Sequence, residues 1–556
     1  MTRRHGETFD AVIIGAGFSG LYALHKLRGL GLRCRLFEAG SGVGGAWYWN
    51  RYPGARCDSE SYFYCYSFSE ELAREWEWTE RFPGQEEIRR YLEHVADRFD
   101  LWPDIQLDTR VTASVYDEAS RRWDVTTGTG EAIRARYVIS AIGSLSAANV
   151  PAIPGLDEFT GRWFHTGHWP HDDVDLAGQR IGVIGTGSTG MQLIPVVAQV
   201  ASQLTVFQRT PNFSMPARNA PLDPGFVADV KARYAELFER SRHSPGGMPL
   251  PAPTQTFADV DPEEARRRYE QAWEHGGVLV LQQFNDLLTN PESNEFAAEF
   301  FRGKIREIVR DPDTAEKLIP KGYPIAAKRP VLDTNYFETF NLPHVRLVDV
   351  RATPITRITP TGIQVGDEHV ELDVIIFATG YDAVSGAFAA IDIRGRDGVR
   401  LADKWRDGPT AYLGLGIAGF PNLLTVNGPC NPALLTNVPV SIEHDVEWIA
   451  DCIEHLEREH IAAIEPSEAA EEAWVAHVAD LVAGTLYPLA DSWWMGANIP
   501  GKPRRFMMYV GGHDKFREHC QAVAAAGYEG FLLTPAEPSG GAAKQPVGLD
   551  PLSSSA

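Results

Sequence analysis

The sequence FDAVIIGAGFSGLYALHKLRGLG at residues 9–31 predicts a strand, a tight glycine turn and a helix. An apolar run with β-branched residues precedes the pattern G-x-G-x-x-G, and apolar residues at helical spacing follow it. Gly15 allows the tight turn, Gly17 lets the backbone approach a pyrophosphate, and Gly20 lets the helix pack closely on the strand. The free N–H groups at the start of such a helix bind phosphates. This stretch therefore predicts a nucleotide-binding unit in an α/β fold.

The same pattern occurs again in QRIGVIGTGSTGMQLIPVVAQVA at residues 179–201, where Gly185, Gly187 and Gly190 take the three glycine positions. A single G-x-G-x-x-G is a weak signal, but here each copy follows a predicted strand and opens a predicted helix. Strands and helices that alternate in this way form parallel sheets covered on both faces. We therefore expect an α/β fold with two Rossmann-like dinucleotide-binding domains and a helical insertion.

The residues after each glycine motif distinguish the two dinucleotides. The strand after the first motif ends at Glu38, whose carboxylate would accept hydrogen bonds from a ribose diol and suits FAD. The strand after the second motif ends instead at Arg209 and Thr210, which would bind a 2′-phosphate that a carboxylate would repel. The second site therefore predicts NADPH rather than NADH. The alternatives are a purely structural glycine turn at the first site and a solvated arginine at the second.

The composition excludes several classes of function. The chain has 556 residues and a formal net charge of −22, which disfavours nucleic acid or an anionic membrane as a partner. None of its six cysteines forms a C-x-x-C pair, which argues against a disulfide reductase and a zinc ribbon. We see no signal peptide before the first strand, and no apolar run approaches the ~20 residues of a membrane span. We expect a cytoplasmic monomer without a metal site.

Long helical segments interrupt the two nucleotide-binding units, so we expect each domain to be assembled from two parts. The expected order is the FAD-binding domain, first part (1–150); the NADP-binding domain, first part (151–220); a helical insertion (221–322); the NADP-binding domain, second part (323–380); the FAD-binding domain, second and helical part (381–534); and a disordered tail (535–556).

The segment FTGRWFHTGHWP at residues 159–170 fits the pattern F-x-G-x-x-x-H-x-x-x-W-P. With the G-G-x-W…Y-P-G-x-x-x-D pattern from Gly44 to Asp58, it resembles the type I Baeyer–Villiger monooxygenases, and most of all the phenylacetone and steroid monooxygenases. The resemblance covers residues 8–534, and related N-hydroxylating and flavin-containing monooxygenases end the first pattern differently. We interpret the segment as an aromatic linker between the two domains, in which His165 fixes geometry by hydrogen bonds.

The resemblance implies a reaction that uses FAD, NADPH and O2. NADPH reduces FAD, a flavin C4a-peroxide forms, and one oxygen atom is inserted next to a ketone carbonyl to give an ester or lactone. Sulfides are implied as further substrates. The alternatives are a flavin-containing monooxygenase that acts on sulfur or nitrogen, a non-oxygenating NADPH oxidoreductase, and a redox-responsive binding module. Aryl-alkyl, cyclic and steroidal ketones all stay open as substrates.

The resemblance also implies the residues of the site. Arg329 and Asp58 would be catalytic, because the guanidinium charge favours a deprotonated peroxide and the carboxylate orients it. Trp493 would close over the nicotinamide, and Leu434 and Leu435 would line the substrate pocket. The FAD-side set is Gly15, Gly17, Ser19, Gly20, Glu38, Gly45, Trp47, Asp58, Tyr64 and the backbone of Val111. The NADP-side set is Gly185, Thr186, Gly187, Ser188, Thr189, Gly190, Gln192, Arg209, Thr210, Lys328, Arg329 and Trp493.

Overall fold

The first glycine turn joins β1 (Thr8–Ile14) to α1 (Phe18–Gly29) in the middle of an eight-stranded sheet, in a computed structural model that describes residues 7–536. β1 pairs in parallel with β2 on one side and with β6 on the other. The strand order is β17-β4-β5-β6-β1-β2-β3, and β18 also pairs with β6. The other strands are β2 (Cys34–Phe37), β3 (Ile105–Gln106), β4 (Val111–Asp117), β5 (Arg122–Thr127), β6 (Ala132–Ser140), β17 (Asp392–Arg394) and β18 (Leu423–Thr425).

This first sheet departs from the expected parallel arrangement. β4, β5 and β6 form an antiparallel meander, because the short turns that join them can connect only antiparallel neighbours. The expectation that residues beyond 381 are helical also needs correction, since β17 and β18 come from that part and pair in parallel with β4 and β6. Each of these two strands is three residues long, too short for a periodic pattern to reveal it.

The second glycine turn joins β8 to α5 (Ser188–Ala198) in a five-stranded parallel sheet of order β12-β9-β8-β16-β7. Its strands are β7 (Arg162–His165), β8 (Arg180–Ile184), β9 (Gln203–Gln208), β12 (Val345–Asp349) and β16 (Val374–Phe377). The aromatic segment 159–170 is therefore more than a linker, because part of it is the edge strand β7. No apolar alternation marks this strand in the sequence, because it has only four residues and its large apolar residue Trp163 is 43% exposed.

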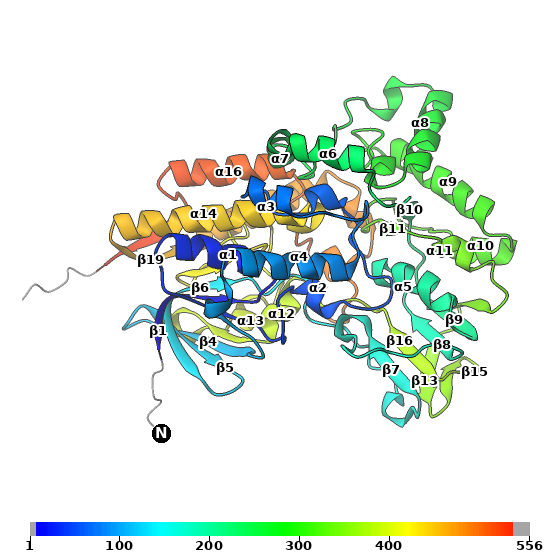
Figure 1. Cartoon of the computed structure of the whole chain (residues 1–556), viewed down its shortest axis with the longest axis horizontal. Helices are drawn as coiled ribbons and strands as arrows, with labels where there is room; N and C mark the ends of the chain where they lie inside the picture. Colours follow the sequence, from blue (N-terminus) through cyan, green and yellow to red (C-terminus); the bar gives the residue numbers. More distant parts are fainter. Residues whose placement is uncertain (1–6, 537–556) are drawn as a thin grey trace, which may run out of the picture.

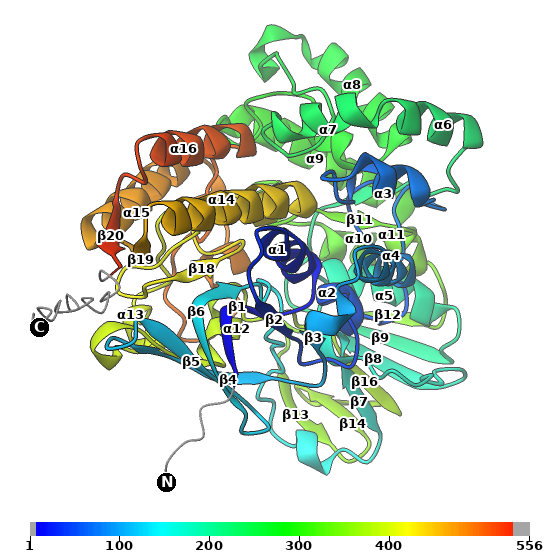
Figure 2. The same ribbon diagram turned by 60° about the vertical axis from the view of Figure 1, so that its left-hand side comes forward.

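Helices cover the two sheets, and the insertion lies along one edge of the molecule. α14 (Val438–Arg458) lies beside α1 over the first sheet, and α5 covers the second (Figure 1). In the turned view, α6, α7, α8 and α9 again gather along one edge (Figure 2). The remaining helices are α2 (Ala46–Trp49), α3 (Glu70–Glu75), α4 (Gln85–Arg98), α6 (Pro224–Ala232), α7 (Tyr234–Arg242), α8 (Pro262–His275), α9 (Pro291–Ile308), α10 (Pro312–Leu318), α11 (Tyr336–Thr339), α12 (Ser385–Ala389), α13 (Leu401–Lys404), α15 (Glu468–Ala483) and α16 (His513–Ala525).

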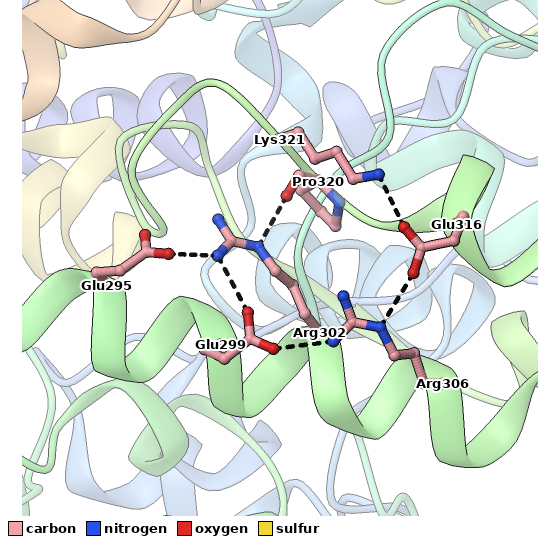
Figure 3. Close-up of polar contacts among 7 residues, drawn as sticks. All are labelled: Glu295, Glu299, Arg302, Arg306, Glu316, Pro320 and Lys321. Carbon is pink, nitrogen blue, oxygen red and sulfur yellow. Dashed lines mark hydrogen bonds and ion pairs between the residues drawn. The ribbon is translucent and has the colours of Figure 1, made fainter.

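A network of charged side chains ties α9 to the segment that follows α10 (Figure 3). The Arg302 Nε donates to the backbone carbonyl of Pro320 at 3.1 Å, and the same guanidinium pairs with carboxylates on α9. Arg306 and Lys321 both pair with Glu316. Exposed ion pairs of this kind each contribute little to stability. Their structural effect is to fix where the chain leaves the insertion before it reaches Lys328 and Arg329.

Three smaller sheets complete the fold, and among residues 7–536 no helix is both long and apolar enough to cross a bilayer. The strands are β10 (Ser214–Pro216) with β11 (Val331–Asp333); β13 (Ile355–Thr359), β14 (Gly362–Val365) and β15 (Glu368–Glu371); and β19 (Ile461–Pro466) with β20 (Phe531–Pro535). Because β20 includes Pro535 and the Ala536 N–H donates to the His460 carbonyl, the expected start of the tail at 535 is wrong. The rest of the expected tail, 537–556, lies outside the described residues.

Replacement of Gly20 by Ala is expected to destabilise the protein. A Cβ on Gly20 would lie 1.7 Å from the Gly15 carbonyl oxygen, so α1 would have to move away from the strand. Overpacking of this kind costs about 1–3 kcal/mol or more, and we expect the melting temperature to fall by several degrees. Gly29→Ala on the same helix is the control, because nothing lies within 4 Å of its Cβ. Equal melting temperatures for the two variants would contradict the close packing.

Candidate active site

The two glycine turns have the same geometry at the ends of β1 and β8, which lie in different sheets. Gly15 and Gly185 have φ angles of +105° and +111°, which favour glycine. A Cβ on Gly15 would lie 2.5 Å from the Ala141 carbonyl oxygen, and one on Gly185 would lie 2.4 Å from that of Ala378. The residues directly after β6 and β16 therefore lie in close contact with the two turns. This explains why both strands are followed by small residues.

The N-terminus of the helix after each turn is free to bind an anion. The N-cap residues are Gly17 for α1 and Gly187 for α5, and neither has a side chain to cap the first N–H groups. A Cβ on Gly45 would lie 2.7 Å from the Gly17 Cα, so Gly45 packs against the first turn. Uncapped helix N-termini beside tight glycine turns suit the pyrophosphates of two dinucleotides.

Glu38 is buried at the end of β2, with both carboxylate oxygens held by the backbone. Oε2 accepts from the Ala16 N–H at 2.8 Å, and Oε1 accepts from the Gly40 N–H at 2.7 Å. Burial raises the pKa of Glu38, and these two donors oppose the shift. Each oxygen has a second lone pair, so the carboxylate can still accept from a ribose diol. The side chain of Val111 is buried at the start of β4, so a contact with a ligand would come from its backbone.

Trp47 and Tyr64 form a pair beside the first helix. The Trp47 Nε1 donates to the Tyr64 hydroxyl at 3.2 Å, and the rings meet edge to face at 5.9 Å. Tyr64 also packs against Phe18, the first residue of α1. Two predicted FAD-side residues are thus brought together, next to the helix that carries Ser19 and Gly20.

Arg329 and Asp58 form a bidentate ion pair across 271 residues of sequence. The Arg329 Nε donates to Asp58 Oδ2 at 3.0 Å, and Nη2 donates to Oδ1 at 2.9 Å and to Oδ2 at 2.7 Å. Nη1 donates to the backbone carbonyl of Leu434 at 3.0 Å. The Asp58 charge is the main cause that raises the pKa of Arg329. The site therefore contains a permanent positive charge held on two sides.

Lys328 and Arg209, which we predicted on the NADP side, lie in a cluster of positively charged side chains. Burial lowers the pKa of Lys328, the Asp491 carboxylate opposes that shift, and the guanidinium groups of Arg209 and Arg351 lower the pKa further. The Lys328 Nζ lies over the Tyr323 ring at 4.5 Å. Cations that repel one another in this way would be stabilised by an anion, which suits a 2′-phosphate. Arg351 was not predicted, because it lies in a loop without a motif.

Other predicted NADP-side residues bind within the protein. The Thr186 hydroxyl donates to the Thr210 carbonyl at 3.2 Å, and Ser188 and Thr189 form the start of α5. The amide of Gln192 accepts from the Tyr52 hydroxyl at 2.8 Å and donates to the Arg56 carbonyl at 3.0 Å. Gln192 thus joins α5 to the segment that carries Asp58. A direct contact between its side chain and a dinucleotide stays a prediction.

The loop that carries Trp493 is fastened to the turn after β16. The Asn498 Nδ2 donates to the Tyr381 carbonyl at 2.8 Å, and Lys502 pairs with Asp382. Trp493 is half-buried and packs on Trp494. Its predicted position over a nicotinamide is untested by these contacts.

The predicted pocket residues Leu434 and Leu435 lie in one short turn, Ala433–Leu435, and have different neighbours. The Leu434 carbonyl faces Arg329, whereas Leu435 borders a cavity of about 220 Å³. The other residues around this cavity are Pro245, Pro432, Thr436, Tyr487, Tyr509, Val510, Gly511 and Gly512. The structure therefore connects the predicted pocket loop to the predicted catalytic arginine.

The sequence did not indicate the side chains that hold the backbone of the segment around Arg329 by hydrogen bonds. The buried amide of Asn294 on α9 binds both the N–H and the carbonyl of Ile325, at 3.0 Å each. The Tyr323 hydroxyl donates to the Pro211 carbonyl at 2.8 Å, and the Asn212 Nδ2 donates to the Arg329 carbonyl at 3.3 Å. Only the burial of Asn294 within a helical pattern would have indicated such a role. His165, in contrast, behaves as expected, because its Nδ1 accepts from the Gly167 N–H.

The chain is similar to known proteins over almost its whole length. Residues 10–239 match the family model described as flavin-binding monooxygenase-like. A Baeyer–Villiger monooxygenase of Pseudooceanicola batsensis is 45% identical over 96% of this chain and 97% of its own length. Phenazine N-monooxygenase PhzNO1 of Lysobacter antibioticus is 44% identical over 94% and 97%.

Solved structures share both the fold and the sequence. A steroid monooxygenase bound to NADP superposes with a TM-score of 0.91 at 48% identity, covering 95% of this chain and 100% of the other. OTEMO in complex with FAD and NADP superposes with a TM-score of 0.91 at 42% identity, covering 95% and 99%. These similarities confirm the resemblance and the α/β fold that the sequence predicted.

Glu38→Gln is expected to weaken flavin retention. A Gln side chain can accept from only one of the two backbone N–H groups and turns its own N–H groups toward the other, a mismatch of about 1–3 kcal/mol. Glu465→Gln is the control, because that buried carboxylate also accepts from a backbone N–H, that of Gly419. Both variants should melt earlier, but only Glu38→Gln should lose flavin absorbance during gel filtration. Equal flavin content in the two variants would contradict this role.

Proposed function

The chain belongs to the Baeyer–Villiger monooxygenases, and from that premise we propose that Arg329, held by Asp58, is the catalytic charge with which it converts a ketone to an ester or lactone. The enzyme depends on FAD and NADPH and transfers one oxygen atom from O2. The observation that carries the role of Arg329 is its bidentate contact with Asp58 beside the predicted pocket loop.

The cofactors supply the redox chemistry and the chain supplies charge and position. FAD reduced by NADPH would, when bound, supply the chemistry that activates O2, with one oxygen atom inserted beside the carbonyl and the other released as water. Arg329 is charged at every physiological pH, so it can stabilise the negative charge that develops on the reacting oxygen. A unit charge pair at about 4 Å is worth about 4 kcal/mol at an effective dielectric constant near 20. That energy corresponds to roughly a thousandfold in rate if it acts only in the transition state.

Asp58 acts through Arg329 as a positioning residue. A long arginine side chain without a partner would sample many rotamers, whereas a bidentate carboxylate fixes both the plane and the direction of the guanidinium. The alternative for this pair is a purely structural salt bridge, and the rate of ester formation distinguishes the two roles.

We assign FAD to the first glycine turn with Glu38, and NADPH to the second turn with Arg209 and Lys328. The expected domain boundaries follow this assignment, with 1–150 and 381–534 around FAD and 151–220 and 323–380 around NADPH. Trp493 would then cover the nicotinamide and help to exclude water from the reaction. The six cysteines are all unpaired and buried, which supports a cytoplasmic enzyme, and we propose that it acts as a monomer.

The substrate is a ketone, and we leave aryl-alkyl, cyclic and steroidal ketones open. Leu434 and Leu435 would shape the pocket. Oxidation of sulfur or nitrogen is the second candidate, because the relative named phenazine N-monooxygenase is 44% identical to this chain. NADPH consumption with acetone, cyclohexanone, thioanisole and phenazine, followed by mass analysis, separates the candidates. Insertion of one oxygen beside a carbonyl supports the first, and oxidation of only thioanisole or phenazine would favour the second.

Arg329→Ala is expected to separate the two halves of the reaction. Reduction of the flavin by NADPH should stay within about threefold of the wild-type rate, while ester formation should fall by roughly a thousandfold or more. Arg134→Ala removes a matched ion pair, with Asp124 in the first sheet, and should leave both rates unchanged. Stopped-flow absorbance and product analysis measure the two rates. A wild-type rate of ester formation in Arg329→Ala would remove this residue from the mechanism.

Arg209→Ala is expected to remove the preference for NADPH. A charge-assisted contact is worth about 1.5–3 kcal/mol, so the KM for NADPH should rise about ten- to a hundredfold while the KM for NADH stays the same. Arg346→Ala is the control, because Arg346 is on β12 of the same five-stranded sheet and forms only an exposed ion pair with Glu368 on β15. An unchanged ratio of the two KM values in Arg209→Ala would show that this side chain is only solvated.

A further inference from the structure

The segment 427–437, which joins β18 to α14, has an unusual backbone. Asn427 and Cys430 have φ angles of +56° and +64°, in the left-handed region that non-glycine residues rarely adopt. Conformations of this kind are strained and persist only where surrounding contacts hold them. The segment also contains Leu434, whose carbonyl accepts from Arg329. What holds this backbone in place therefore bears on the arginine.

A buried carboxylate on α14 holds the segment. Asp445 is fully buried, and the Asn431 Nδ2 donates to its Oδ1 at 3.1 Å and to its Oδ2 at 3.0 Å. The backbone N–H of Asn427 donates to Oδ2 at 2.8 Å. Burial raises the pKa of Asp445 to about 8, and the hydrogen bonds from Asn427 and Asn431 oppose the shift. One side chain thus binds the segment at two points.

Asn431 carries this support toward Arg329. Its Oδ1 accepts from the Ala433 N–H at 2.9 Å and from the Ser441 hydroxyl at 3.3 Å. Ala433 begins a short 3₁₀ helix of one turn, Ala433–Leu435, and the next residue is Leu434. Among residues 7–536, the Leu434 carbonyl is the hydrogen-bond acceptor of Arg329 Nη1. Each step from Asp445 to the guanidinium is therefore a hydrogen bond or a neighbouring peptide unit.

The contact with Leu434 has a function that Asp58 cannot supply. Asp58 binds the edge of the guanidinium formed by Nε and Nη2 and leaves Nη1 at the opposite corner. A planar group held along one edge can still tilt about that edge, whereas a third contact at Nη1 fixes its plane. A displacement of about 1 Å in a reacting constellation can cost a hundredfold in rate.

We propose that Asn431 and Asp445 are positioning residues that fix the plane of the Arg329 guanidinium through the Leu434 carbonyl. This inference rests on the proposed function of Arg329. It explains why the amide of Asn431 and the buried carboxylate of Asp445 hold the segment 427–437, whose other proposed role is to line the substrate pocket. It also predicts that the pair acts on oxygen transfer and not on reduction of the flavin.

Asn431→Ala is the test, with Asn422→Ala as the matched control. Asn422 is also a buried amide that binds two backbone groups, the Ala462 carbonyl and the Ile464 N–H, but it lies at the start of β18. Both variants should melt earlier. Only Asn431→Ala should lose ester formation, by about tenfold to a hundredfold, and form hydrogen peroxide instead, while flavin reduction by NADPH stays unchanged.

Two further measurements separate the positioning role from a general loss of stability and give a result that does not depend on enzyme activity. Asp445→Asn preserves the shape and an acceptor for the Asn427 N–H, so it should keep most of the ester formation, whereas Asp445→Ala should behave like Asn431→Ala. Hydrogen–deuterium exchange of the purified protein without NADPH or ketone should show faster exchange at 427–437 in Asn431→Ala and no change there in Asn422→Ala.

The outcomes separate this inference from the proposed function. If the wild type forms no oxygenated product from any ketone, the proposed function fails. If the wild type forms esters and Asn431→Ala forms them equally well, the positioning role is wrong. Equal losses of ester formation in Asn431→Ala and Asn422→Ala would likewise overturn it, because they would reflect a general loss of stability.

Discussion

The ion pair between Arg329 and Asp58 is the interaction on which the arrangement of the site depends. Its members lie 271 residues apart, one in the segment after α2 and the other where the chain returns from the helical insertion. A part-buried guanidinium is costly without a partner, and a single bidentate carboxylate offsets that cost while it fixes direction. The pair can form only if two sheets, the insertion and the loop before α14 are all in place.

Several neutral contacts maintain the junction where this pair lies. A Cβ on Gly54 would lie 2.4 Å from the Gln192 carbonyl oxygen, so the segment with Asp58 packs directly on α5 of the second sheet. Asn294 binds the backbone of Ile325 and so positions the segment with Arg329 from the side of the insertion. These amide contacts carry no net charge, and they set geometry without a change in the electrostatics of the site. Arg329 supplies the positive charge of the site, and uncharged side chains around it help to fix its position.

The glycine motifs, Glu38, Arg209 and the strands beside them could be predicted because each depends on local spacing. The pairing of Arg329 with Asp58 was expected only from family resemblance, since no local pattern connects residues so far apart. The strand β7 and the short strands β17 and β18 were missed because an open edge or three residues give no periodic signal. Asn431 and Asp445 gave no signal either, because the role of a buried polar residue depends on partners that only the fold brings near, and Asn294 had only its place in a helical pattern to indicate it.

The fate of labelled oxygen tests the central claim most directly. Wild-type protein, NADPH and cyclohexanone are incubated under ¹⁸O₂, and product, hydrogen peroxide and NADPH are measured together. We expect one labelled oxygen atom in each lactone and one NADPH oxidised per lactone, because a Baeyer–Villiger monooxygenase takes the inserted atom from O2 and uses one NADPH for each insertion. A lactone without the label, or NADPH oxidation that yields only hydrogen peroxide with this and every other ketone, would contradict the account.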